Sequence, residues 1–219
     1  MTAESKKIVV LISGSGSNLQ ALIDNQLSGQ LGGQIAAVIS NKQQAYGLVR
    51  ANNANISTHV VNHQDYSNRE DYDQALSEVI DTYQPDLVVL AGFMRILTAA
   101  FVQKYVGKML NIHPSLLPKY QGLNTHQRAI DAGDKMHGVS VHFVTEELDG
   151  GPVVCQAKIE VTDSDTAETL AQRIHAKEHI IYPKVVRWFC QQRLKMHHNQ
   201  AWLDDKVLPV TGELYVEKN

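Results

Sequence analysis

The sequence predicts an α/β fold, in which one twisted, mostly parallel sheet is flanked by helices and extended by an antiparallel pair of strands toward the C-terminal half. Short apolar runs alternate with longer amphipathic stretches over residues 8–90, which is typical of βαβ units. Two runs of alternating apolar and polar residues then surround a Gly-Gly-Pro turn at residues 150–152. With 219 residues and 43% hydrophobic residues, the chain can bury a sizeable core.

The first half is expected to contain five strands and three helices. The strands are short and apolar, and they fall at Ile8–Ile12, Ile35–Ile39, Thr58–Val61, Leu87–Leu90 and Lys108–Ile112. The helices fall at Ser17–Leu27, Ala45–Asn53 and Asn68–Tyr83. In the last of these, apolar residues recur at helical spacing and form one face.

The second half is expected to begin with the antiparallel pair Gly138–Thr145 and Val153–Val161. A long helical region follows, from about Thr166 to Leu194, and Pro183 should kink it or divide it into two helices. Because no repeat or linker interrupts the pattern, residues 1–219 are predicted to form one domain. Residues 1–6 should be loosely held, and residues from about 200 to 219 should form a C-terminal hairpin, around 202–208, and a tail.

Composition excludes several classes of function. The net charge of −3 gives no broad basic surface for nucleic acid. No apolar run approaches the roughly 20 residues of a membrane span, and no signal peptide is visible. Cys155 and Cys190 lack metal-binding spacing, and His175 and His179, although one helical turn apart, do not belong to an HExxH motif. We therefore expect a cytoplasmic protein without metal, nucleic-acid or membrane partners.

The segment Asn111–Pro118 contains the first candidates for catalysis. Asn111 and His113 are two residues apart in a predicted strand, so both side chains lie on one face. The amide is a neutral hydrogen-bond donor, and the imidazole titrates near neutral pH. This pair suits a reaction that builds negative charge on a carbonyl oxygen and moves a proton. The alternative is a histidine at the surface or in the core.

The segment Ser13–Asn18 follows the first strand directly and opens the first helix. Small residues let backbone N–H groups approach an anion, and the helix N-terminus adds a favourable potential. Leu19 stands where a dinucleotide fingerprint needs its third glycine, and the Gly-Lys-Ser/Thr of a Walker loop is missing. The segment is either a tight turn with Ser17 as N-cap or a cradle for a monophosphate.

Two further segments are candidates for ligand contacts. Leu90–Leu97 lies at the carboxyl end of an interior strand and can either hold a flat ring or lead into a core-packed helix. Leu148–Pro152 has the composition of a turn. If Asp149 lies beside His113, its charge would orient the ring and favour the imidazolium.

Together these segments resemble the phosphoribosylglycinamide formyltransferases, the folate-dependent enzymes of purine synthesis. The resemblance extends from about residue 7 to residue 209. It is carried by the segments Val9–Gln20, Leu90–Leu97, Asn111–Pro118, Val141–Val144 and Leu148–Pro152. The Asn-x-His-Pro-Ser-Leu-Leu-Pro motif is shared by the wider formyltransferase superfamily, whereas the glycine loop and Gly122–His126 narrow the match.

The resemblance implies a Rossmann-like formyltransferase fold and transfer of a formyl group from 10-formyltetrahydrofolate to the amine of glycinamide ribonucleotide. The implied catalytic residues are Asn111, His113 and Asp149. The implied phosphate and ribonucleotide contacts are Gly16, Ser17, Asn18, His175, Ala176, Lys177 and Glu178. The implied folate contacts are Arg69, Met94, Arg95, Ile96, Leu97, Asn111, Thr145, Glu146, Glu147, Leu148 and Asp149. Gln121 and Asn124 depart from the family, which often has Pro and His there.

Two alternatives remain open. One is another enzyme of the superfamily, such as a formyltetrahydrofolate hydrolase, although such a hydrolase should carry an extra N-terminal domain. The other is a non-catalytic nucleotide-binding module, which would leave Asn111, His113 and Asp149 without a role. The expected partners are small-molecule substrates only, and the expected state is a monomer or a weak homodimer.

Overall fold

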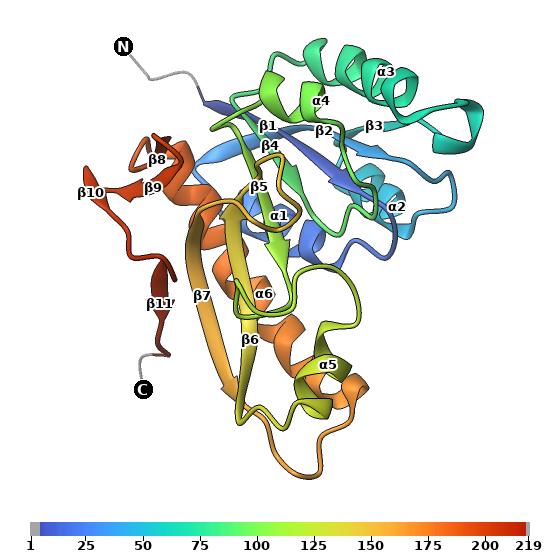
Figure 1. The fold of residues 1–219 in the computed structure, drawn as a ribbon. Coiled ribbons are helices and arrows are strands. Elements are labelled where there is room, and N and C mark those ends of the chain that lie inside the picture. Colours follow the sequence, from blue (N-terminus) through green and yellow to red (C-terminus); the bar gives the residue numbers. More distant parts are fainter. Residues whose placement is uncertain (1–4, 218–219) are drawn as a thin grey trace. The chain divides into compact units, whose positions relative to one another are not determined.

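The computed structural model describes residues 5–217 and divides into two compact units, Met1–Leu110 and Asn111–Asn219 (Figure 1). The strand β5, Met109–His113, begins in the first unit and ends in the second. That the chain forms one domain stays a prediction.

The first unit contains a parallel sheet with the strand order β4-β1-β2-β3. The strands are β1 (Lys6–Ile12), β2 (Gly33–Ser40), β3 (Ser57–Val60) and β4 (Leu87–Leu90). All residues of β4 are buried, and so are Ile8–Ile12 of β1. Burial on both faces explains why they read as continuous apolar runs.

Helices cover both faces of this sheet. They are α1 (Ser17–Leu27), α2 (Tyr46–Asn53), α3 (Arg69–Asp81) and α4 (Ala99–Lys104), with a 3-10 turn at His63–Asp65. Figure 1 shows α1 and α2 on one face and α3 and α4 on the other. Strand order reverses at β1, so right-handed crossovers place α3 opposite α1 and α2. Asn68 starts α3 by accepting the N–H of Asp71 at 2.8 Å.

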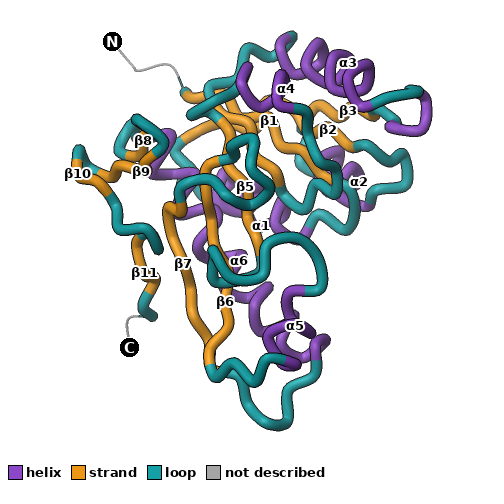
Figure 2. Tube along the Cα trace, in the orientation of Figure 1, coloured by secondary structure: helices purple, strands orange, loops and turns teal. Residues whose placement is uncertain are grey.

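The second unit is built on the antiparallel pair β6 (Met136–Phe143) and β7 (Val153–Glu160). β11 (Glu213–Tyr215) pairs with β7 in parallel. The long helix α6 (Ala167–Cys190) packs along β6 and β7 (Figure 2), and α5 (Thr125–Asp131) contacts α6. A separate antiparallel sheet contains β8 (Leu194–His197), β9 (Gln200–Leu203) and β10 (Lys206–Val207).

The polar residues of β6 are buried together with its apolar residues. The alternation in the sequence is typical of a strand with one solvent-facing side. Val139 and Val141 are fully buried as expected, but Ser140 and His142 on the opposite face are also buried. The polar face of β6 therefore lies inside the second unit, where it contacts Asn111 of β5 and the loop after β5.

Several predictions about the ends of elements were wrong. α6 ends at Cys190 rather than near Leu194, which begins β8. It continues through Pro183 as one helix, so the predicted division into two helices was wrong. A proline costs a helix one N–H bond, and packing against two strands compensates for that loss here. Lys6, predicted to be loose, is the first residue of β1, and its Nζ lies 2.8 Å from Asp86 Oδ1. Residues 1–4 lie outside the described residues.

The predicted fold class is confirmed, with a mostly parallel sheet, flanking helices and an antiparallel extension. The predicted hairpin near the C-terminus corresponds to β9 and β10. Over residues 5–217, every helix is too short or too polar to cross a lipid bilayer.

Candidate active site

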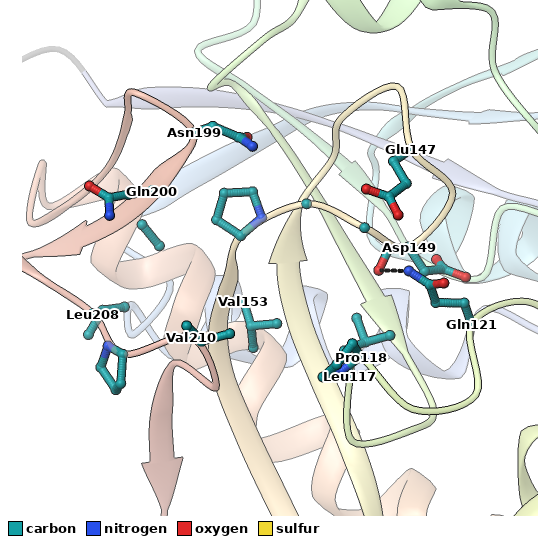
Figure 3. A pocket seen from close by; sticks show the side chains of 15 residues that line it. Leu117, Pro118, Gln121, Glu147, Asp149, Val153, Asn199, Gln200, Leu208 and Val210 are labelled. Carbon is teal, nitrogen blue, oxygen red and sulfur yellow. Dashed lines mark hydrogen bonds between the residues drawn. The ribbon is translucent and has the colours of Figure 1, made fainter.

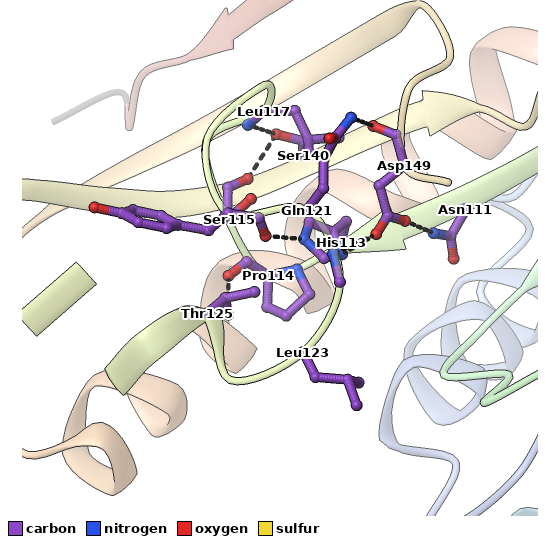
Figure 4. Close-up of polar contacts among 12 residues, drawn as sticks. Asn111, His113, Pro114, Ser115, Leu117, Gln121, Leu123, Thr125, Ser140 and Asp149 are labelled. Carbon is purple, nitrogen blue, oxygen red and sulfur yellow. Dashed lines mark hydrogen bonds and ion pairs between the residues drawn. The ribbon is translucent and has the colours of Figure 1, made fainter. Parts of the chain in front are cut away.

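Asn111, His113 and Asp149 lie together in the second unit, as the sequence predicted (Figure 4). Asn111 and His113 project from β5, and Asp149 lies in the loop between β6 and β7. The amide Nδ2 of Asn111 donates to Asp149 Oδ1 at 3.3 Å, and Nδ1 of His113 lies 3.3 Å from Asp149 Oδ2. One carboxylate thus binds both residues that share the strand face.

The ring of His113 lies between two acceptors. Its Nε2 is 2.8 Å from the carbonyl oxygen of Tyr120, and its Nδ1 faces Asp149. Burial lowers the pKa of His113 and outweighs the Tyr120 carbonyl and Asp149, which raise it. Asp149 thus favours the imidazolium, as expected, but the cost of burying a cation is larger. A proton arriving on the ring would still find two acceptors in place.

Asp149 is held in its ionised form. Burial opposes its charge, but His142, the N–H of Gly122 and His113 together hold the pKa of the carboxyl below its usual value. The Gly122 N–H donates to Oδ2 at 2.9 Å. The backbone of Asp149 is left-handed, with a φ of 49°, which aspartate tolerates better than most residues. The Asp-Gly-Gly-Pro turn thus delivers a carboxylate to the site.

His142 belongs to this cluster, although the sequence analysis gave it no role. Its Nδ1 lies 2.8 Å from the carbonyl of Phe143, so that nitrogen carries the hydrogen. Its Nε2 then accepts from Nδ2 of Asn111 at 3.1 Å. Together with Asp149, His142 fixes the orientation of the Asn111 amide. The sequence pattern placed it only on the same strand face as Ser140, and the burial of that face is seen in the structure.

The loop after His113 is held by polar side chains from β6 and β7. Ser140 Oγ donates to the carbonyl of Ser115 at 2.7 Å and accepts the N–H of Leu117 at 3.0 Å. Gln156 Nε2 donates to Ser140 Oγ at 3.0 Å and to the Leu117 carbonyl at 2.9 Å. All four residues are buried, so these bonds are shielded from competing water. They fix the start of the loop that returns to His113 at Tyr120.

Gln121 and Asn124, which depart from the family pattern, take part in this returning loop. Gln121 Nε2 donates to the backbone carbonyl of Asp149 at 3.4 Å (Figure 3), and Arg128 donates to the carbonyl of Gln121 at 2.7 Å. Asn124 has a φ of 57° and precedes α5 as its N-cap residue, without a side-chain capping bond. Gln121 therefore adds a contact to the Asp149 loop, whereas Asn124 serves the backbone turn.

In the first unit, Gly16, Ser17 and Asn18 form the predicted turn into α1. Gly16 is the N-cap, with a left-handed φ of 70°, and Ser17 is the first helical residue. The prediction that Ser17 is the N-cap was therefore wrong by one residue. A Cβ on Gly16 would lie 2.6 Å from Cα of Gly47, so glycine is needed for space as well as for its φ.

The segment Met94–Leu97, also in the first unit, is held at both ends. Ser13 Oγ accepts the N–H of Met94 at 2.8 Å, and the buried carboxylate of Asp73 accepts the N–H of Thr98 at 2.6 Å. Between these bonds, Met94 and Ile96 are exposed, at 68% and 58%. The segment is thus a fixed stretch of backbone that presents two apolar side chains to the outside.

The remaining predicted contacts lie on three elements. Arg69 is the exposed first residue of α3 in the first unit. In the second unit, Thr145–Leu148 belong to the β6–β7 loop, and the His175–Glu178 turn belongs to α6. Nδ1 of His175 lies 3.0 Å from the buried carboxylate of Glu178, an interaction that raises the pKa of His175. Lys177 pairs with Glu217 at 2.9 Å, and Ala176 is exposed.

A cavity of about 380 Å³ in the second unit borders the loop of Asp149 (Figure 3). Its walls include Gln121, Glu147, Asp149, Val153 and Val210. Over residues 5–217, no three His, Cys, Asp or Glu side chains gather so that they could hold a metal ion.

The cysteines take no part in the site. Cys155 is fully buried in β7, and this burial raises the pKa of its thiol to about 12. At neutral pH it is therefore protonated and a poor nucleophile. The amide, imidazole and carboxylate of the Asn111 cluster can move a proton and donate a hydrogen bond to a substrate oxygen, which is the chemistry of acyl transfer to an amine or to water.

Comparison with known proteins gives a consistent result. The family model described as formyl transferase matches residues 6–186. The phosphoribosylglycinamide formyltransferase of Escherichia coli (strain K12) is 56% identical over 205 residues, which cover 94% of this chain and 97% of that protein. The protein of the same name from Haemophilus influenzae is 52% identical and covers 94% and 98%.

Solved structures agree with the sequence comparison. The structure of the Coxiella burnetii phosphoribosylglycinamide formyltransferase in complex with CHES superimposes with a TM-score of 0.93 at 54% identity, covering 97% of this chain and all of that one. The chain therefore belongs to the formyl transferase family of enzymes.

Proposed function

We propose that this enzyme transfers the formyl group of 10-formyltetrahydrofolate to the primary amine of glycinamide ribonucleotide, a step of purine biosynthesis. The observation that carries the proposal is the convergence of Asn111, His113 and Asp149 in a chain 56% identical to an enzyme of that name. The substrates are small molecules, the formyl donor is derived from folate, and the enzyme acts in the cytoplasm.

The reaction begins with attack of the neutral amine on the formyl carbon, which drives the carbonyl electrons onto oxygen. His113, neutral in the free enzyme, takes the proton that the attacking nitrogen releases. The imidazolium that forms is stabilised by Asp149, 3.3 Å from Nδ1. The same proton then passes to the folate nitrogen as its bond to the formyl carbon breaks. Proton transfer through one residue thus links the attack to the departure.

Asn111 has the role of an oxyanion donor. Its Nδ2 carries two hydrogens, directed at His142 Nε2 and at Asp149 Oδ1 in the free enzyme. The contact to Asp149 is the longer of the two, at 3.3 Å against 3.1 Å, so its hydrogen is the one that the developing negative charge can share without rotation of the amide. His142 holds the other hydrogen, so the amide stays oriented during the reaction.

Substrate binding is assigned to the residues named by the resemblance. Gly16, Ser17 and Asn18 bind the ribonucleotide phosphate through backbone N–H groups at the start of α1, and the turn His175–Glu178 contacts the ribonucleotide. Met94–Leu97, Arg69 and Thr145–Asp149 contact the folate. Support for the folate role comes from the fixed backbone and the exposed Met94 and Ile96, which suit a flat aromatic ring.

One assay tests the proposal. Purified enzyme is mixed with 10-formyltetrahydrofolate, with and without glycinamide ribonucleotide, and release of tetrahydrofolate is followed by absorbance. Release that depends on the amine is expected. Release at the same rate without the amine would identify a formyltetrahydrofolate hydrolase instead, and no release in either mixture would contradict the assignment.

A further inference from the structure

The turn that opens α1 is held from outside by the neighbouring helix α2. The N–H of Gly47 donates to the carbonyl of Gly14 at 3.0 Å. Nε of Arg50 donates to the carbonyl of Ser15 at 2.9 Å. Two consecutive carbonyl groups of the turn are therefore bound on the side that faces α2, and both donors belong to a helix for which sequence and family resemblance gave no role.

These two bonds determine the direction of the following amides. In a planar trans peptide, the C=O of one residue and the N–H of the next point in opposite directions. Because the carbonyls of Gly14 and Ser15 point to α2, the N–H groups of Ser15 and Gly16 point away from it. The carbonyl of Gly16 accepts the N–H of Gln20 at 2.9 Å, which leaves the N–H of Ser17 at the open end of α1.

The Arg50 side chain is itself fixed. Its Nη1 donates to Oε1 of Gln20 at 3.1 Å, and its guanidinium lies over the ring of Tyr46, 5.0 Å from the centroid. Gln20 in turn donates to Asp24 at 2.8 Å. An arginine can serve Ser15 and Gln20 together because its donors form a rigid fork, whereas a lysine offers a single nitrogen.

Little space is left for a side chain at position 47. A Cβ there would lie 2.5 Å from Cδ1 of Ile12 and 3.3 Å from Cα of Gly16. The reverse substitution meets the same obstacle, since a Cβ on Gly16 would lie 2.6 Å from Cα of Gly47. The two backbones are thus in direct contact, which is what allows the N–H of Gly47 to reach the turn.

We propose that Arg50 and Gly47 are positioning residues for substrate phosphate: they bind the Ser15 and Gly14 carbonyls and thereby direct consecutive backbone N–H groups toward the phosphate of glycinamide ribonucleotide. This inference rests on the phosphate-binding role assigned above to Gly16–Asn18. Arg50 acts through the turn, since its Nε and Nη1 bind Ser15 and Gln20.

The decisive variant is Arg50→Met, compared on two substrates. With glycinamide ribonucleotide, KM should rise about tenfold, the loss expected for about 1.4 kcal/mol of binding, while kcat and KM for the formyl donor stay within twofold. With the same substrate lacking its phosphate, Arg50→Met and wild type should have equal kcat/KM. Arg50→Lys, which keeps the charge but not the fork, should lie between them. An equal loss on both substrates, or an unchanged KM, would overturn the proposal.

Lys42→Met is the matched control. Lys42 is an exposed cation in the segment before α2, and its loss removes one positive charge without removing a bond to the turn. It should leave KM for glycinamide ribonucleotide within twofold of wild type. If Lys42→Met weakened binding as much as Arg50→Met, charge alone would explain the effect and the positioning role would be wrong.

Binding of ribose 5-phosphate, measured by calorimetry without any formyl donor, separates this inference from the proposed reaction. Wild type should bind it, and Arg50→Met should bind it about tenfold more weakly at an unchanged thermal midpoint. The enzyme could fail to formylate glycinamide ribonucleotide and still bind ribose 5-phosphate in an Arg50-dependent way. That result would contradict the proposed function and support the inference. Absence of ribose 5-phosphate binding in wild type would overturn the inference.

Discussion

Asp149 is the residue that joins the proposed catalytic cluster together. It accepts from Asn111 and Gly122 and faces His113, although the chain brings these groups from three separate segments. The carboxylate keeps its charge despite burial because N–H donors and rings surround it. A neutral group of the same shape would keep the geometry and lose the charge that stabilises the imidazolium.

Asp149→Asn should therefore reduce kcat by about 10²–10³, since the transition state loses electrostatic stabilisation that the ground state does not use. Steady-state kinetics and circular dichroism measure the loss and confirm the fold. Asp163→Asn, which changes a fully exposed carboxylate, is the control and should keep wild-type turnover. Turnover of Asp149→Asn near that of wild type would exclude Asp149 from the mechanism.

The pH dependence should report His113. Since burial lowers its pKa and the neutral ring is the base, kcat/KM should fall as pH decreases through a pKa below 6.5, the ordinary value. Asp149 raises that pKa, so in Asp149→Asn the acid limb should move to lower pH. A profile of kcat/KM against pH checks both statements, and an acid limb that moves upward in the variant would contradict them.

At the scale of elements, the sequence predicted the long buried strands and the helices with clear periodicity, and it placed Asn111 and His113 on one face of β5. It did not predict α4, α5, β8 or β11, which span six, seven, four and three residues. Helices of six or seven residues are too short to show a clear period, and β8 and β11 lack the continuous apolar run that marks the equally short β4.

The sequence could not assign His142 for a different reason. An alternating strand does not reveal whether its polar face meets water or another part of the chain. Here that face meets the loops that carry the catalytic residues, and this depends on contacts between distant segments. The direction of the pKa shift of His113 could not be predicted from the sequence either, because it depends on how deeply the ring is buried.

The segment between β4 and α4 should depend on its hydrogen bond to Asp73 of α3. Asp73→Ala removes the acceptor of the Thr98 N–H and should raise KM for 10-formyltetrahydrofolate several-fold, with KM for glycinamide ribonucleotide unchanged. Leaving this part-buried N–H unpaired should also lower stability, by about 1 kcal/mol. Kinetics and urea unfolding measure the two effects. Glu78→Ala, an exposed change on the same helix, should alter neither.

For the whole molecule, buried histidines should make stability depend on pH. His137 is almost fully buried, and Nδ1 of His126 lies 3.1 Å from its Nε2. Burial, reinforced by the neighbouring His126, lowers the pKa of His137 to about 4. The unfolded chain therefore binds a proton near pH 6.5, whereas the folded chain binds it only near pH 4. Folding is favoured above this interval and loses stability within it.

The free energy of unfolding should accordingly fall as pH decreases from about 6.5 to about 4, by up to about 1.4 kcal/mol per pH unit for this group. In His137→Gln the slope over this interval should become smaller, whatever the change in stability at pH 7. Urea unfolding at several pH values measures it. His198→Gln, at an exposed residue, should keep the wild-type slope, and an equal slope in His137→Gln would contradict the argument.

The hydrogen bonds of the Ser140 hydroxyl should restrict which substitutions are tolerated during evolution. It bonds to Ser115, Leu117 and Gln156 at once, so a change to alanine would leave three buried polar groups without that partner. A change of Gln156 alone would remove one of the three bonds of this hydroxyl and leave the Leu117 carbonyl without the Gln156 donor. We therefore expect substitutions of Ser140 and Gln156 to be tolerated only when both residues change together. In a library selected for growth without purines, positions 140 and 156 should vary together or remain fixed.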